Sequence, residues 1–134
     1  MTADRRITVA VCDDHEMFRE GIAEMLSFAE DIEVVGGAAD HDETVALVLE
    51  ERPDVVLLDL EMPGMGADEA MRRMHALSPH PRVVVLTMHN EPGMVRRFLR
   101  QGAAGYLPKS AEMDELVEAV RDAARAPATP GGTT

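Results

Sequence analysis

The chain has 134 residues, of which 46% are hydrophobic and 28% charged, values typical of a single soluble globular domain. Its 13 Lys and Arg residues stand against 25 Asp and Glu residues, so the net charge is −12. This balance argues against a nucleic-acid-binding surface on these residues, because such a surface needs a basic face. It leaves open a DNA-binding segment in a longer parent protein.

The cellular compartment is predicted from the lone cysteine and from hydropathy. Cys12 cannot form an internal disulfide, which suits a reducing compartment, and its place in a strand pattern predicts a buried core residue. No stretch reaches the ~18 uninterrupted apolar residues of a membrane helix. The first residues also lack the apolar segment of a signal peptide. We therefore expect a cytoplasmic protein with no membrane partner.

Five short apolar stretches predict β-strands, in chain order 7–12, 32–38, 55–58, 83–86 and 104–107. The first, third and fourth are continuously apolar and rich in β-branched residues, as in parallel strands that are covered on both faces. The second is interrupted by Glu33 and by glycines, which suits an edge strand, and the fifth is short.

Between and after these strands, apolar residues recur every three or four positions and predict five helices. Asn90 is a candidate N-cap for the fourth helix and Ser110 for the fifth. The apolar stripes are Phe18, Ile22, Met25, Leu26 and Ala29; Val45, Val48 and Leu49; Ala70, Met71, Met74 and Leu77; Met94, Val95, Phe98 and Leu99; and Met113, Leu116, Val117 and Val120.

The strict alternation of strands and helices predicts an α/β fold, a single doubly wound domain with a parallel sheet. We place this domain at residues 1–125. Residues 126–134 are small, rich in Pro and Gly and without periodic pattern, which predicts a flexible C-terminal tail or linker.

Asp59 is an acid at the end of a buried strand, followed at once by a loop that contains Pro63 and Gly64. This position is poor for packing and good for chemistry, because open α/β sheets bind ligands at the carboxyl ends of their strands. Asp13 and Asp14 follow another apolar strand and would share the crevice if the two strands are neighbours. Three converging carboxylates would repel one another without a divalent cation.

Hard oxygen ligands of this kind suit Mg²⁺. Asp13 and Asp14 are adjacent, so one is expected to bind the ion directly while the other acts through water or orients a partner. The same residues can also cap the helix that begins near Glu16, but capping alone would not call for an acid at the end of a second strand.

A hydroxyl and an ammonium group end two further strands. Thr87 closes the fourth strand and could donate to an anionic oxygen, and Lys109 follows the fifth as a counter-charge to the acids. A carboxylate nucleophile such as Asp59 can accept a phosphoryl group as an acyl phosphate, while cations neutralise the phosphoryl oxygens. The alternatives are that Thr87 simply fits a strand and that Lys109 is solvated.

The complete set resembles the response-regulator receiver domain of two-component signalling, over about residues 7–124. The residues that carry the resemblance are Asp13-Asp14, Asp59 with Met62-Pro63-Gly64, Thr87 and Lys109. Residues 102–107 and 31–36 look like the subgroup with a C-terminal LuxR-type helix-turn-helix (NarL/FixJ-like).

The resemblance implies a flavodoxin-like (βα)5 fold with strand order 2-1-3-4-5. It also implies that Asp59 takes phosphate from a sensor histidine kinase, with Mg²⁺ bound by Asp13 or Asp14, Asp59 and the Glu61 main-chain carbonyl. Thr87 would move toward the phosphoryl group and Tyr106 would turn inward, changing the face made by the fourth helix and the fifth strand. A homodimer is left open, and DNA binding is inferred only for a C-terminal domain outside this chain.

The loop behind Asp59 departs from the family pattern. Gly66 stands where relatives commonly have a helix-capping Asp, followed by Ala67, and Asp68 stands where an apolar residue is common. These changes affect the expected rigidity of the loop rather than the nucleophile.

Other polar residues receive weaker predictions. Glu61 and His89 would flank the path of a hydrolytic water, or else be solvated rim residues. His15 is expected near the pocket mouth, and exposed positions are expected for His41, His75 and His80.

Two other functions compete with a phosphoacceptor module. A metal-dependent phosphatase would also use Asp59 as nucleophile, with Glu61 as the general acid, but no cap domain is evident. A receiver-like interaction domain that no longer takes phosphate usually lacks an acid or the lysine, and here none is missing.

Overall fold

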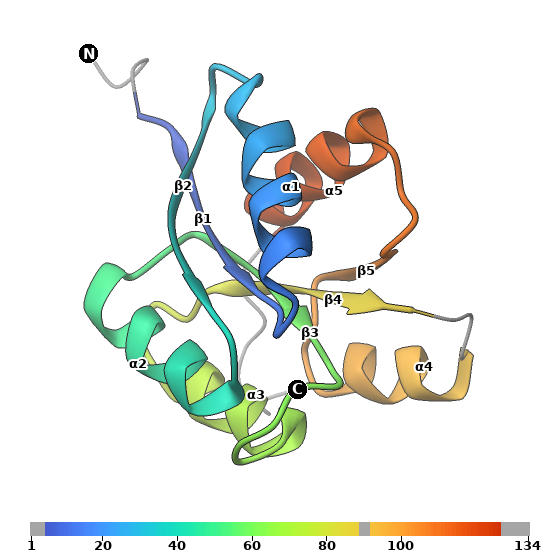
Figure 1. The fold of residues 1–134 in the computed structure, drawn as a ribbon. Coiled ribbons are helices and arrows are strands. Elements are labelled where there is room, and N and C mark those ends of the chain that lie inside the picture. The colour runs from blue at the N-terminus through green and yellow to red at the C-terminus, as the bar shows by residue number, and fades with distance from the viewer. Residues whose placement is uncertain (1–4, 89–91, 127–134) are drawn as a thin grey trace.

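The computed structural model describes residues 5–88 and 92–126, in which strands and helices alternate strictly (Figure 1). The elements are β1 (Ile7–Cys12), α1 (Glu16–Ser27), β2 (Ile32–Ala38), α2 (His41–Glu51), β3 (Val55–Asp59), α3 (Ala67–His75), β4 (Arg82–Thr87), α4 (Pro92–Arg100), β5 (Gly105–Pro108) and α5 (Met113–Arg125). None of the described helices is long and apolar enough to cross a membrane. The expected tail lies outside the described residues except for Ala126, and Asn90 and His89 lie outside them as well.

All five strands belong to one parallel sheet with the order β2-β1-β3-β4-β5. Val9 pairs with Val34 on one side and with Val55 on the other, which places β1 between β2 and β3. The predicted α/β fold and its strand order are therefore confirmed, with β2 and β5 at the edges. β3 lies at the centre, and all five of its residues are buried.

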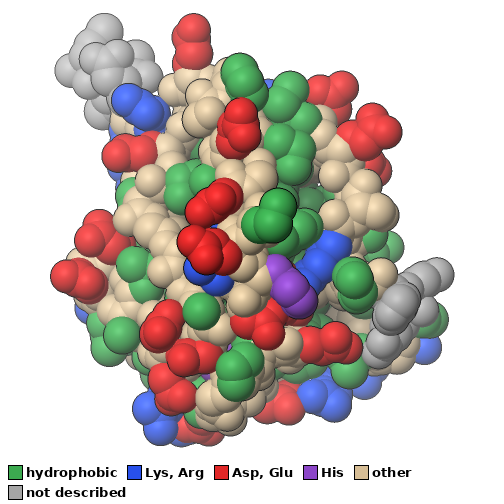
Figure 2. All heavy atoms as spheres, in the orientation of Figure 1, with side chains coloured by type: hydrophobic (Ala, Val, Ile, Leu, Met, Phe, Trp, Pro, Cys, Tyr) green, Lys and Arg blue, Asp and Glu red, His purple; other side chains and the backbone are tan. Residues whose placement is uncertain are grey.

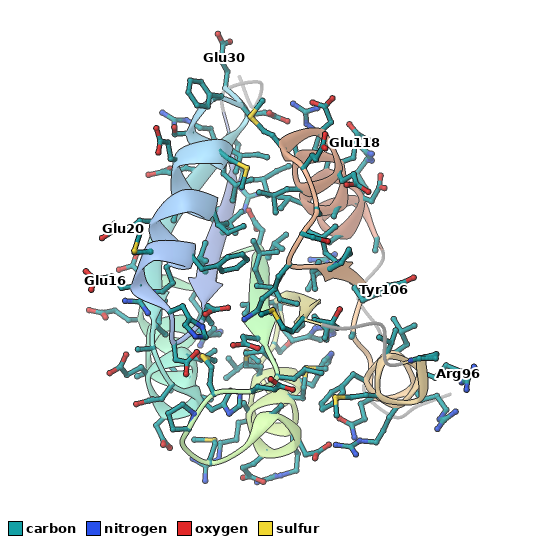
Figure 3. The ribbon with its side chains drawn as sticks, turned by 45° about the vertical axis from the view of Figure 1, so that its right-hand side comes forward. Glu16, Glu20, Glu30, Arg96, Tyr106 and Glu118 are labelled. Atoms are coloured by element: carbon teal, nitrogen blue, oxygen red, sulfur yellow. The ribbon has the colours of Figure 1, made fainter. Side chains whose placement is uncertain are left out.

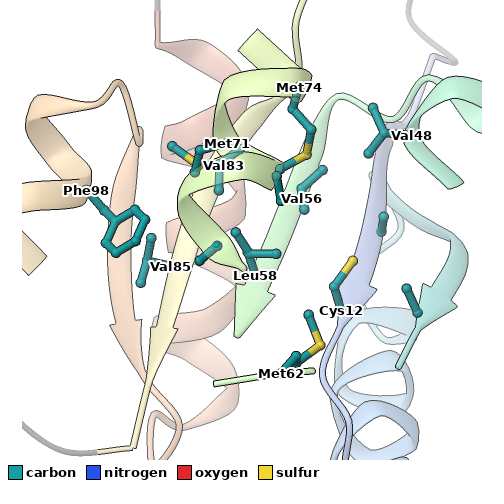
Figure 4. Packing of buried hydrophobic residues seen from close by; sticks show 14 residues of the cluster. Cys12, Val48, Val56, Leu58, Met62, Met71, Met74, Val83, Val85 and Phe98 are labelled. Atoms are coloured by element: carbon teal, nitrogen blue, oxygen red, sulfur yellow. The ribbon is translucent and has the colours of Figure 1, made fainter. Parts of the chain in front are cut away.

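Helices cover both faces of the sheet, α1 and α5 on one and α2, α3 and α4 on the other (Figure 1). Successive side chains of a strand point to opposite faces. Val56 and Leu58 therefore pack with Met71 and Phe98 beneath α3 and α4 (Figure 4), whereas Leu57 packs on the α1 and α5 side. Two covered faces explain why the inner strands are continuously apolar.

The fifth helix begins later than its predicted cap. Ser110 lies in a turn in which the Ala111 N–H donates to the Pro108 carbonyl at 3.0 Å, so the backbone is not yet helical there. The N-cap is Glu112, whose main-chain N–H donates to the Glu115 carboxylate at 3.0 Å. The Ser110 prediction is wrong because that tight turn delays the helix until Met113.

The prediction that His41, His75 and His80 are exposed is also wrong, because none of the three is exposed. His41 is fully buried, His80 is only 9% exposed and His75 is half-buried. Each ring has a main-chain carbonyl within reach: His41 Nε2 lies 3.1 Å from Asp59 O, His75 Nε2 lies 3.2 Å from Gly102 O, and His80 Nδ1 lies 3.1 Å from Pro81 O. Polar rings can be buried when such partners replace water.

Cys12 is fully buried, as the sequence predicted, and it packs on the α2 and α3 side of the sheet. Burial raises the pKa of its thiol to about 12. Since only the thiolate reacts, the native thiolate fraction at pH 8 is roughly 10³-fold below that of an unfolded cysteine. We expect an aromatic disulfide reagent to leave native Cys12 unmodified at pH 8 and to label it quickly in denaturant. Equal labelling rates in both conditions would contradict this assignment.

Candidate functional site

Four residues singled out in the sequence lie at the carboxyl edge of the sheet. Asp13 follows β1, Asp59 ends β3, Thr87 ends β4 and Lys109 follows β5. These strands run parallel and are neighbours in the sheet, so their carboxyl ends open onto one crevice. The fold brings together side chains that are up to 96 residues apart, counting from 13 to 109.

The Lys109 ammonium lies between two buried carboxylates. Its Nζ is 2.6 Å from Oδ2 of Asp13 and 3.1 Å from Oδ2 of Asp59. The residues Asp13 and Asp59 are only 0% and 3% exposed, and a buried charge is unfavourable unless it is paired. Nζ also lies 5.1 Å from the centroid of the Phe18 ring, within range of a cation–π contact.

Burial and pairing shift the pKa values of the two acids in opposite directions. Burial raises the pKa of Asp59, against the hydrogen bonds from the Glu61 N–H and Lys109. Burial also acts on Asp13, but the charged contact with Lys109 and the hydrogen bond from the His15 N–H outweigh it and lower the pKa of Asp13. For Lys109, burial opposes the charged form, yet the two acids outweigh it and raise the pKa of Lys109.

Asp14 and His15 extend the acidic cluster toward solvent. His15 Nδ1 lies 3.2 Å from Oδ1 of Asp13 and 3.1 Å from Oδ1 of Asp14, and its side chain is 71% exposed. His15 therefore lies at the pocket mouth, where the sequence placed it. Figure 2 shows acidic side chains gathered near the centre of this face, with basic and histidine atoms among them.

The donor atoms fit a divalent cation. One ligand atom each from Asp13, Asp14 and His15 lie within 4.8 Å of one another, and the carboxylates are hard oxygen ligands of the type that Mg²⁺ prefers. Oδ2 of Asp13 is buried, and apart from its ion pair with Lys109 no described residue gives it a well-directed hydrogen bond. A buried carboxylate oxygen in that state has coordination capacity left for a metal ion.

Thr87 and Glu61 lie next to Asp59 at a small hollow in the surface. Together with Met88 and Met94 they line this hollow, which includes Asp59 itself. The Glu61 N–H donates to Oδ1 of Asp59 at 3.0 Å, which fixes one carboxylate oxygen. Thr87 therefore lines the same hollow as the predicted nucleophile.

Tyr106 points away from this hollow. It stands on the edge strand β5, and its side chain projects outward near α4, where Arg96 also points to solvent (Figure 3). Tyr106 is 53% exposed. The inward turn expected for it would therefore be a change from the conformation seen here.

Three contacts to the site were not anticipated from the sequence. Phe18 covers Lys109, Arg19 Nη1 donates to the Asp13 carbonyl at 2.5 Å, and His41 Nε2 lies 3.1 Å from the Asp59 carbonyl. Phe18 and Arg19 lie near the start of the helix that follows the acid pair, so their proximity to the site could have been predicted from the sequence. His41 comes from a different helix, and no sequence signal pointed to it.

The loop between β3 and α3 accommodates its unusual residues. Gly66 is the N-cap of α3 and has φ +96°, a backbone angle that an Asp would adopt only with strain. The Asp68 carboxylate accepts hydrogen bonds from Arg97 at 2.7 Å and from Gln101 at 2.9 Å. An acid at position 68 thus links α3 to α4, which an apolar residue could not do by hydrogen bonds.

Residues 9–121 match the family described as the response regulator receiver domain. The chain belongs to this family. The receiver domain is 43% identical over 115 residues to the response regulator GacA of Pseudomonas aeruginosa, covering 86% of this chain and 54% of GacA. The chain thus spans about half the length of this curated relative.

Solved structures agree with the family assignment. The receiver domain of the response regulator NarL from Mycobacterium tuberculosis has a TM-score of 0.86 and 38% identity, covering 92% of this chain and 99% of that one. A two-component response regulator of the LuxR family from Aurantimonas has a TM-score of 0.82 and 33% identity, covering 89% and 85%. The predicted resemblance to the NarL and LuxR type of regulator is confirmed.

The raised pKa of Asp59 predicts that its carboxylate destabilises the fold at neutral pH. A buried acid with a raised pKa favours folding when protonated, and this contribution is lost as pH rises through the folded-state pKa. In EDTA at pH 7 we expect Asp59→Asn to raise the melting temperature by a few degrees, and the gain to shrink as the pH falls toward the unfolded-state pKa of about 3.9.

Asp13→Asn is the matched control, because Asp13 is equally buried and contacts the same lysine. Its lowered pKa contributes stability above the unfolded-state pKa, so this variant should melt at a lower temperature at pH 7. Calorimetry at pH 4 and pH 7 measures both effects. A lower melting temperature for Asp59→Asn at pH 7 would contradict the assignment.

Proposed function

We propose that this receiver domain accepts a phosphoryl group on Asp59 from a phosphohistidine of a sensor kinase. Receiver domains interact with sensor histidine kinases, and the chain belongs to that family. The observation that supports the proposal best is the ion pair of Lys109 with both Asp13 and Asp59. It places a counter-charge beside a carboxylate that ends the central strand and borders a hollow at the surface.

In the transfer step an Asp59 carboxylate oxygen attacks phosphorus. A new O–P bond forms as the P–N bond to the kinase imidazole breaks, and the leaving nitrogen keeps the bonding electron pair and is protonated from water. The Lys109 ammonium can pair with the incoming phosphoryl oxygens, and the Thr87 hydroxyl can donate to one of them. Negative charge therefore arrives where the protein already holds a cation and a donor.

Receiver domains generally use Mg²⁺ at this acidic pocket. We assign its protein ligands to Asp13, Asp14, Asp59 and the Glu61 main-chain carbonyl, with Asp13 or Asp14 acting directly and the other through water. The ion, when bound, supplies neutralisation of the phosphoryl charge. The buried Oδ2 of Asp13 and the acidic cluster around it support this assignment.

The output of the domain is a change at the face formed by α4 and β5. A phosphoryl group adds charge and acceptor oxygens, which would draw the Thr87 hydroxyl toward Asp59 and let Tyr106 turn inward. In a longer parent protein this change would regulate a C-terminal DNA-binding domain, and a homodimer is one means of doing so. The half-length match to GacA supports a further domain.

The central test is phosphorylation by acetyl phosphate in the presence of Mg²⁺. We expect one labile phosphoryl group per chain, with none in EDTA and none in Asp59→Asn. Asp68→Asn is the matched control, because Asp68 lies in the first turn of the helix behind the same loop but contacts Arg97 and Gln101 instead of Lys109. Mass spectrometry measures the modification. Phosphorylation that survives in Asp59→Asn, or repeated turnover of phosphoesters, would contradict the proposal.

The proposed inward turn of Tyr106 on phosphorylation is testable by intrinsic fluorescence, because the chain has one tyrosine and no tryptophan. Tyr106 is half-exposed here, so an inward turn should change its emission and reduce its accessibility to a collisional quencher. We expect phosphorylation to lower quenching in the wild type and to leave it unchanged in Thr87→Ala that is phosphorylated to the same extent. An equal change in both proteins would exclude Thr87 from the switch.

A further inference from the structure

α2 begins with a buried histidine that contacts the main chain of the predicted phosphoacceptor. His41 is fully buried, and its Nε2 lies 3.1 Å from the carbonyl oxygen of Asp59. A carbonyl oxygen only accepts hydrogen bonds, so this contact is a hydrogen bond only when Nε2 carries the hydrogen. The bond joins the start of α2 to the end of β3.

A second contact holds the same loop farther along. The His41 main-chain N–H donates to the Pro63 carbonyl at 3.0 Å. At Gly64 the loop passes so close to α2 that an added Cβ would lie 2.8 Å from Asp42 Oδ2 and 3.1 Å from His41 N. His41 therefore holds both ends of the segment 59–63, which contains Glu61.

The state of the other ring nitrogen, Nδ1, indicates that His41 does more than fill space in the core. Nδ1 is buried, and no described residue provides it with a hydrogen-bond partner. A buried polar atom without a partner is unfavourable, and an apolar side chain of similar size would avoid this. The burial of an imidazole at this position is accounted for by the hydrogen bond that Nε2 makes.

We propose that His41 is a positioning residue for the Mg²⁺ and phosphoryl site. By fixing the Asp59 carbonyl and the Pro63 carbonyl, it holds the Asp59 carboxylate and the Glu61 main chain at a constant distance from Asp13. The loop needs such support because Gly64 and Gly66 both have positive φ and add no side-chain contacts of their own. The inference rests on the proposed function of Asp59.

Mg²⁺ is sensitive to this kind of support because it demands nearly ideal octahedral geometry. Loss of a residue that orients metal ligands typically weakens metal binding by about 10- to 100-fold. His41→Leu keeps the volume and removes the donor, whereas His41→Gln can place an amide N–H near the former Nε2. Val48→Ala is the matched control, since Val48 is a fully buried residue of the same helix that takes no part in the site.

The test is a Mg²⁺ titration of the unphosphorylated protein, followed by the backbone amide resonances of Glu61 and its neighbours. We expect His41→Leu to weaken Mg²⁺ binding at least about 10-fold, His41→Gln to restore most of the loss, and Val48→Ala to bind as the wild type does while melting at a lower temperature. Wild-type affinity in His41→Leu, or an equal loss in Val48→Ala, would overturn the proposal.

Nitrogen-15 spectra of the wild-type imidazole provide a test that needs no variant. They should show hydrogen on Nε2 and a bare Nδ1, and the opposite tautomer would also overturn the proposal. Failure of the wild type to accept phosphate on Asp59 is a separate outcome, which removes the proposed function. Normal phosphorylation with unchanged Mg²⁺ binding in His41→Leu removes only the role of His41.

Discussion

Two carboxylates at the ends of neighbouring strands are held together by one ammonium group. Lys109 lies 2.6 Å from Asp13 and 3.1 Å from Asp59, and all three side chains are nearly excluded from solvent. Without that cation the two acids would repel each other in surroundings that stabilise charge poorly. The pairing lowers the pKa of Asp13 but does not overcome the effect of burial on Asp59, whose pKa stays raised. The single positive charge of Lys109 therefore does not fully compensate the two buried carboxylates, and a bound metal ion can supply further positive charge.

The rest of the domain serves to hold these charges in place. Parallel strands bring four chain segments to one edge, and apolar layers on both faces exclude water from β3. Main-chain carbonyls of the acids are held from outside the sheet, by Arg19 at Asp13 and by His41 at Asp59. The main chains of both acids thus have fixed positions, although the loop that follows Asp59 contains Gly64 and Gly66.

Contacts between helices connect the site to the face formed by α4 and β5, which is the surface expected to change on phosphorylation. Asp68, just beyond the loop behind Asp59, accepts hydrogen bonds from Arg97 and Gln101 near the end of α4. Lys109 also links the ends of β4 and β5, because its main-chain N–H donates to the Thr87 carbonyl at 2.7 Å. A change of charge at Asp59 therefore acts on groups that are joined to α4 and β5.

The sequence by itself determined the order and type of every element, because unbroken β-branched runs and helical stripes reflect which faces are covered. It also predicted that Asp13, Asp14, Asp59, Thr87 and Lys109 would lie together, because in a parallel sheet the residues that end the strands lie at one ligand-binding edge. The order of the elements follows from the local pattern of apolar residues, and the clustering of the polar residues follows from the rule that the carboxyl ends of parallel strands meet at one edge.

Only the tertiary structure decided how the site is supported. The burial of His41 depends on the Asp59 carbonyl, 18 residues away, and the role of Asp68 depends on Arg97, 29 residues away. The delayed start of α5 likewise depends on a turn that leaves Ser110 outside the helix. A polar side chain is exposed or buried according to the partner it meets in space, and the local pattern of residues does not contain that partner.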